Sequence, residues 1–214
     1  RCESHEWYRV QTNLERPASV RNYTSLGYRK MRAPEELMDM LRTFWESQAD
    51  EVLHFQPNST HPEHPFRERV YTLDFNTWDN DTLIVPISPN LHENVAHARH
   101  QLTPYYGSAS ILGRDSSDSS LTMRSFDDTR DLVEEWMGGI PVRDHLAFGL
   151  RVYQGGHVVS SHTNDLFATA EITVAQDLEE DWPLEVYGHD GVARNVTVRP
   201  GEMVLFESSS VIHG

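Results

Sequence analysis

The last third of the chain contains a series of short strand-like runs, and this series constrains the fold more than any other feature. From Leu146 onward the sequence reads "LAFGLRVY", "ATAEITVAQ", "LEVYG", "NVTVRP" and "MVLFE". Turn signals such as His189-Asp190-Gly191 and Arg199-Pro200-Gly201 separate the later runs. Short strands at this spacing are typical of a sandwich or barrel. We therefore predict an antiparallel β region over residues 145–213.

The part before residue 145 shows helical periodicity. Leu37, Leu41 and Phe44, with Trp45, lie on one face at helical spacing, which predicts a helix over residues 35–48. Pro34 suits the first turn of this helix, and the acidic residues that follow lie at its positive end. Similar spacing predicts a helix at about 90–102, and a further helix is predicted at 126–137, with Ser125 or an adjacent Asp as its N-cap. Gly138-Gly139 ends the last of these.

The remaining stretches are polar or rich in proline. The first thirty residues, residues 54–70 and "GRDSSDSS" are expected to be irregular, whereas Thr82–Ile87 is expected to form a short buried strand. No internal repeat or domain boundary is evident. We predict a single domain over residues 1–214, with a helical and loop-rich part (1–144) followed by the β core (145–214).

Composition excludes some classes of function. The chain has 214 residues, of which 38% are hydrophobic and 24% charged, as in ordinary globular proteins. Its net charge of -15 disfavours binding to phosphate backbones, so we expect no nucleic-acid partner. No apolar run reaches the length of a spanning helix, so we expect no membrane span.

Four Asn-x-Ser/Thr sequons favour a secreted protein or one in the lumen of the secretory pathway. Their acceptor residues, which are predicted glycosylation sites, are Asn22, Asn58, Asn80 and Asn195. Cys2 is the only cysteine, so it has no partner within the chain. In a secreted protein it would pair between chains, giving a homo-oligomer or fibrous assembly, or remain an unpaired thiol.

The β region also carries the residue types of a metal site. His162 opens "HTND", which contains Asn164 and Asp165, and His213 follows the strand-like run "MVLFE". Two histidines and a carboxylate on adjacent strands can occupy one face of an iron and leave the other face open, as in non-haem Fe(II) oxygenases. These four residues are the candidate metal ligands.

At this point the chain resembles a known family. The order Tyr153, His162 and "PGEMVLFESSSVIHG" is similar to that of the 2-oxoglutarate and Fe(II)-dependent dioxygenases, in particular the prolyl 4-hydroxylase-like branch. The resemblance covers roughly residues 145–214, with "WPLEVYGHDG" among its most specific parts, and "RSFDDTRDLVEEWMGG" is compatible with the helix before the core.

The resemblance implies an α+β fold with a double-stranded β-helix (jelly roll) preceded and buttressed by helices. It implies that His162 is the proximal ligand, that His213 is the distal ligand and that Tyr153 contacts 2-oxoglutarate. Fe(II) and 2-oxoglutarate are the implied cofactors, with ascorbate as a further candidate, and a peptide or protein is the implied substrate.

Two departures from the family pattern bear on activity. The family has aspartate two residues after the first histidine, where this chain has Asn164, and Asp165 comes one place later. Successive side chains on a strand point to opposite faces, so Asp165 reaches the metal only if the chain bulges there. The family also places a basic 2-oxoglutarate clamp about ten residues after the distal histidine, on the last strand, and the sequence given ends at Gly214.

Two functions of different classes follow. The first is a dioxygenase that hydroxylates a peptidyl, prolyl-type substrate in the secretory pathway. The second is a non-catalytic, glycosylated jelly-roll module that serves as a structural or assembly component of an extracellular structure. Asn164, the missing clamp, the sequons and Cys2 favour the second.

Overall fold

The computed structural model describes residues 2–47, 49–53, 71–73, 77–78, 82–85, 129–142, 150–153, 155, 158–164 and 167–214. The predicted helix at 90–102 therefore lies outside the described residues, as do Asn58, Asn80 and Asp165. The chain divides into two compact units. The first comprises Arg1–Met38, Asp131–Pro141 and Val159–Gly214, and the second comprises Asp39–Arg130 and Val142–Val158.

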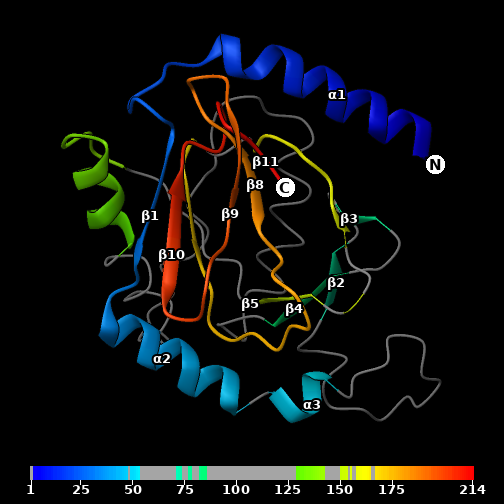
Figure 1. Ribbon diagram of the computed structural model, residues 1–214, viewed down its shortest axis with the longest axis vertical. Helices are drawn as coiled ribbons and strands as arrows, with labels where there is room; N and C mark the ends of the chain where they lie inside the picture. The colour runs from blue at the N-terminus through cyan, green and yellow to red at the C-terminus, as the bar shows by residue number, and fades with distance from the viewer. Residues whose placement is uncertain are drawn as a thin grey trace, which may run out of the picture. The chain divides into compact units, whose positions relative to one another are not determined.

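The first sheet of the first unit has strand order β1-β10-β7 and is antiparallel throughout. β10 (Glu202–Phe206) lies between β1 (Tyr28–Arg32) and β7 (Thr169–Ile172) (Figure 1). Because β10 is the central strand, the four residues after its first are all buried. The alternative of a parallel sheet with crossover helices is thus excluded for this part of the chain, and the predicted antiparallel pairing is confirmed.

The second sheet of this unit has order β11-β8-β9. It consists of β8 (Leu184–Tyr187), β9 (Ala193–Val196) and β11 (Ile212–His213), again antiparallel. The turn between β8 and β9 contains Gly191, whose φ of 74° is one that glycine adopts without steric cost. One core cluster draws on both sheets and comprises Val186, Val196, Val204, Phe206 and Val211.

The prediction that the first thirty residues are irregular is wrong, because they contain α1 (Cys2–Ser19) and the start of β1. The apolar residues Trp7, Val10 and Leu14 do have helical spacing, but their side chains are exposed. A surface helix normally shows a broad apolar face toward the core, and these exposed residues do not form such a face, so the helix was not predicted. The strand β1, "YRKMR", is mostly charged and is defined by its pairing with β10, which sequence periodicity does not show.

The helices predicted near residues 35–48 and 126–137 are confirmed where the structure describes them. α2 (Glu35–Glu46) buries Leu37 and Leu41 and begins with two acidic residues, and a short α3 (Ala49–Leu53) follows. Residues 129–136 are helical, and Gly138 and Gly139 end this helix with positive φ angles. No helix among the described residues is both long enough and apolar enough to cross a membrane.

The second unit contains an antiparallel sheet of order β2-β4-β5. Its strands are β2 (Tyr71–Leu73), β4 (Thr82–Val85) and β5 (Leu150–Val152), and β4 confirms the strand predicted from Thr82 over its described length. Two further short strands are β3 (Thr77–Trp78) and β6 (Val158–Val159). Helices combined with antiparallel sheets agree with the predicted α+β class.

Candidate metal centre

His162 and His213 are neighbours on adjacent chain segments of the first unit. They form an isolated antiparallel bridge, in which the His162 amide donates to the His213 carbonyl at 2.8 Å and the reverse bond measures 3.0 Å. The two ring centroids are 4.5 Å apart. Both residues are buried, with exposed fractions of 7% and 4%. The structure therefore brings together the two histidines that the sequence singled out.

The ring nitrogens of both histidines have defined roles. The His162 Nδ1 lies 2.8 Å from the carbonyl oxygen of Ser160, and the His213 Nδ1 lies 2.9 Å from that of Val211. A carbonyl oxygen only accepts hydrogen bonds, so Nδ1 carries the proton in each neutral ring and Nε2 carries the lone pair. Histidines that bind metals are commonly oriented in this way, with the other ring N–H donated to a backbone carbonyl.

Asn164 shares this side of the segment with His162, as expected for positions two residues apart. Its Nδ2 lies 3.4 Å from the His213 Nε2 and 3.5 Å from the Thr169 hydroxyl. The Thr169 hydroxyl in turn donates to the Ser208 hydroxyl at 2.8 Å. Asn164, at the position where the family has its aspartate, therefore contacts the histidine pair. Its side chain also contacts the hydrogen-bonded hydroxyls of Thr169 and Ser208.

The donor atoms of His162, His213 and Asn164 suit a divalent metal, but these side chains provide no negative charge to balance it. Two neutral imidazoles and an amide oxygen are ligands that iron accepts, but none of them carries a negative charge. The described part of the chain holds no group of three or more His, Cys, Asp or Glu residues that could hold a metal ion. A divalent cation bound by His162, His213 and Asn164 alone would keep its full charge in a buried site, which is unfavourable. Whether Asp165 supplies the carboxylate stays a prediction.

The other predicted site residues are not tested by this geometry. Tyr153 is half-buried and belongs to the second unit, so its contact with 2-oxoglutarate stays a prediction. The side chains of Asn22 and Asn195 are exposed, as a glycan requires, but glycosylation also stays a prediction. Cys2 is the first residue of α1.

Sequence reasoning missed Glu207, which lies at the end of β10 and is fully buried. Its carboxylate accepts three hydrogen bonds from the segment after α1: from the Tyr23 amide (2.8 Å), the Thr24 amide (2.7 Å) and the Thr24 hydroxyl (2.7 Å). Glu207 thereby fixes the start of the loop that leads to His213. A charged residue directly after the apolar run "MVLF" was the available signal.

A second contact to the same segment comes from His189. Its Nδ1 lies 2.9 Å from the Thr24 carbonyl, and its Nε2 lies 2.8 Å from the Ser210 hydroxyl. By the same reasoning the Nδ1 donates to the Thr24 carbonyl, and the Nε2 shares a hydrogen bond with the Ser210 hydroxyl. Both nitrogens of His189 are therefore engaged within the protein, so we assign it a structural role.

Comparison with known proteins gives a structural match but no sequence match. No protein-family model and no curated protein matches the sequence. A crystal structure of a Pseudomonas putida prolyl-4-hydroxylase matches with a TM-score of 0.46 and 14% identity, over 92% of this chain and 88% of that chain. At this TM-score the likeness establishes neither the fold nor the function of this chain.

Proposed function

We propose that this chain is a jelly-roll protein of the 2-oxoglutarate and Fe(II)-dependent dioxygenase superfamily, with His162 and His213 as its metal ligands. The observation that carries the proposal is the bridge between the two histidines, with both Nδ1 atoms tethered to backbone carbonyls. This arrangement directs the metal-binding role to the two Nε2 atoms. The order of Tyr153, His162 and "PGEMVLFESSSVIHG" adds sequence support.

The roles of the described residues follow from their contacts. His162 and His213 would hold Fe(II), which when bound supplies the oxygen-activating chemistry of this superfamily together with 2-oxoglutarate. The backbone carbonyls of Ser160 and Val211 hold the imidazoles in one tautomer and orientation. The Phe206 ring, 4.4 Å from the His213 ring centroid, shields one side of the pair from water. A peptidyl, prolyl-type substrate in the secretory pathway is part of this proposal.

A second candidate function is a non-catalytic, glycosylated jelly-roll module. The observation that favours it is the contact between the Asn164 amide nitrogen and the His213 Nε2. A donor in this position competes with a metal for the lone pair on Nε2, and Asn164 adds no negative charge. In this case the histidine pair would stabilise the fold, and the chain would act in an assembly, with Cys2 linking copies.

Metal titration of Asn164 variants tests the proposal. The Asn164→Asp substitution restores one negative charge, so we expect Fe(II) to bind about a hundredfold more tightly, which corresponds to about 2.7 kcal/mol. Anaerobic calorimetry with wild type, Asn164→Asp and Asn164→Ala would measure this. Unchanged affinity in Asn164→Asp would count against the metal centre and favour the non-catalytic function.

The same experiment decides between the two oxygen ligands. If Asn164 occupies the ligand position, Asp165→Ala leaves the affinity close to that of wild type. Tight binding by wild type that is lost in Asp165→Ala but kept in Asn164→Ala would instead identify Asp165 as the ligand and require a bulge at that position.

A further inference from the structure

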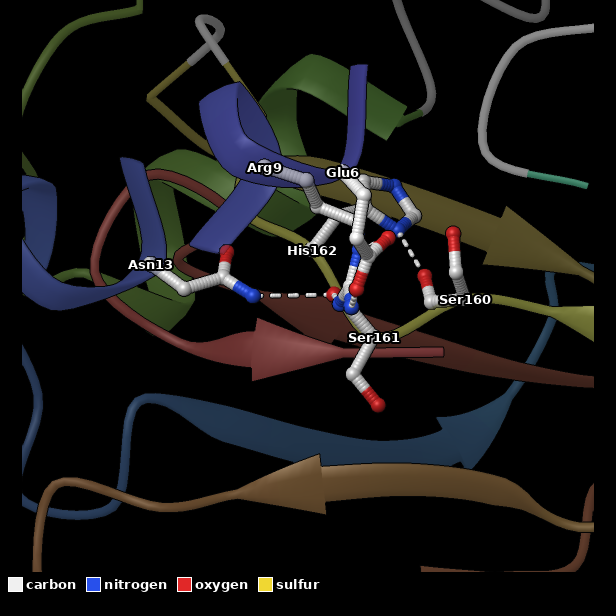
Figure 2. A network of polar contacts seen from close by, with 6 residues as sticks. All are labelled: Glu6, Arg9, Asn13, Ser160, Ser161 and His162. Atoms are coloured by element: carbon white, nitrogen blue, oxygen red, sulfur yellow. Dashed lines mark hydrogen bonds and ion pairs between the residues drawn. The ribbon is translucent and has the colours of Figure 1, made fainter. Parts of the chain in front are cut away.

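The polar face of α1 lies against the segment that carries His162. This face consists of Arg9, Asn13 and Arg16, which are four and three residues apart and so share one side of the helix. The Asn13 Nδ2 donates to the Ser161 carbonyl at 2.9 Å, Arg9 donates to the same carbonyl, and the Arg16 Nη1 donates to the Thr163 carbonyl at 3.4 Å. Figure 2 shows Arg9 and Asn13 converging on Ser161 beside His162.

These contacts occupy the second edge of the backbone around His162. His162 pairs through its own amide and carbonyl with His213 on one edge. In an extended chain the carbonyls of the flanking residues, Ser161 and Thr163, point to the opposite edge. Side chains of α1 take the place of a neighbouring strand there. The backbone on both sides of His162 is thus fixed from two directions.

The orientation of α1 indicates that positioning, rather than core formation, is its main contribution. Its opposite side carries Trp7, Val10 and Leu14, of which Trp7 is 68% and Leu14 71% exposed. The helix therefore buries few large apolar side chains, and its described contacts to this segment are polar. The Asn13 Oδ1 is buried and has no partner among the described residues, so Asn13 acts through its Nδ2.

Resting on the proposed metal centre, we propose that Asn13, with Arg9, is a positioning residue that sets the place of His162 and so tunes metal affinity. Removing these donors frees the Ser161 carbonyl and lets the segment shift. The His162 imidazole and its Nδ1 acceptor, the Ser160 carbonyl, lie on this segment and move with it. Loss of such outer contacts around a metal-binding histidine typically lowers affinity about 10–100-fold.

The test compares Asn13→Ala with Gln11→Ala. Gln11 lies on the same helix, and within the described part of the chain its side-chain amide bonds to Glu15 of that helix, so it is a matched control. Both substitutions introduce alanine, the best helix former, so neither weakens α1 through propensity. We expect Fe(II) affinity to fall about tenfold in Asn13→Ala and further in Arg9→Gln/Asn13→Ala. We expect Gln11→Ala to match wild type and Asn13→Gln to recover part of the loss.

A metal-independent measurement separates this proposal from the metal centre itself. Hydrogen exchange of the His162 and His213 amides, which form the bridge, should be faster in Asn13→Ala while the melting temperature stays within about 2 °C of wild type. If wild type binds Fe(II) but Asn13→Ala binds it equally well, the positioning role is refuted and the metal centre stands. If wild type binds no Fe(II), the metal centre is refuted. In that case faster exchange in Asn13→Ala still supports the positioning of His162 by Asn13, and unchanged exchange refutes that positioning.

Discussion

Replacing the buried Glu207 by glutamine should destabilise the protein well beyond what a change of one atom suggests. The carboxylate receives three hydrogen bonds, two on Oε1 and one on Oε2, all from Tyr23 and Thr24. A glutamine keeps one oxygen and replaces the other with an NH₂ group that accepts no hydrogen bond. If the glutamine oxygen takes the place of Oε1, both bonds from Thr24 are kept. The NH₂ group then takes the place of Oε2, so the Tyr23 amide N–H faces another donor.

The magnitude follows from these contacts. One buried donor without a partner costs about 1–3 kcal/mol, and loss of the charge on the remaining two bonds adds about 1 kcal/mol. We therefore expect Glu207→Gln to lower the free energy of unfolding by about 2–4 kcal/mol. Equilibrium unfolding in urea, followed by far-ultraviolet circular dichroism, measures this difference.

Glu202→Gln is the matched control. Glu202 is the first residue of β10, whereas Glu207 directly follows that strand. Glu202 accepts a hydrogen bond from the Arg199 amide at 2.8 Å and pairs with Lys30 at 2.7 Å. The Glu202 side chain is partly exposed to solvent, where such an ion pair contributes about 0–1 kcal/mol to the free energy of unfolding. Equal effects of the two substitutions, or an effect of Glu207→Gln below about 0.5 kcal/mol, would refute the assigned role of Glu207.

Three further predictions concern the rest of the first unit. Gly27→Ala should cost about 2–5 kcal/mol and Gly191→Ala only about 1–2 kcal/mol in urea unfolding. Both glycines have positive φ angles, but a new Cβ at Gly27 would collide with the Val211 Cγ2 methyl group, whereas at Gly191 it would meet no described atom. Equal costs would refute the crowding at Gly27. The hydrogen bond from Arg194 lowers the pKa of Asp190 to about 2, so its stabilising contribution is present above the ordinary carboxyl pKa and is lost as the pH falls through about 2. Carbon NMR titration should show that Arg194→Gln raises this pKa, and an unchanged value would contradict the pairing. Leu14→Ala should change the free energy of unfolding by less than about 0.5 kcal/mol, and a loss of 2 kcal/mol or more would show that this side of α1 is buried.

The sequence predicted those elements whose apolar residues face the core. β10 and α2 were predicted because the apolar run "MVLF" and the spacing of Leu37 and Leu41 both reflect burial. α1 was missed because its described contacts to the His162 segment are made by polar side chains, and β1 was missed because, apart from Tyr28 against the core, it is held by backbone pairing with β10. Neither kind of contact is visible as an apolar period, and in α1 the apolar residues at helical spacing, Trp7, Val10 and Leu14, are exposed.

The candidate site was predicted in part for a similar reason. His162 and His213 were recognised from residue type and order, and the structure places their rings 4.5 Å apart. The tethers on Nδ1 and the donors of Asn13 and Arg9 all involve backbone carbonyls. Every residue carries such a carbonyl, so the sequence alone does not indicate which of them accept these bonds.

The most direct test of the metal centre is a titration of three histidine variants with Fe(II) under anaerobic conditions. We predict that wild type binds one Fe(II) per chain weakly, because the described ligands carry no negative charge. We predict that His162→Ala and His213→Ala each reduce binding below detection while circular dichroism shows folded protein. His189→Gln, which changes a histidine engaged only in structural contacts, should bind as wild type does. Binding that survives in both His162→Ala and His213→Ala would contradict the account.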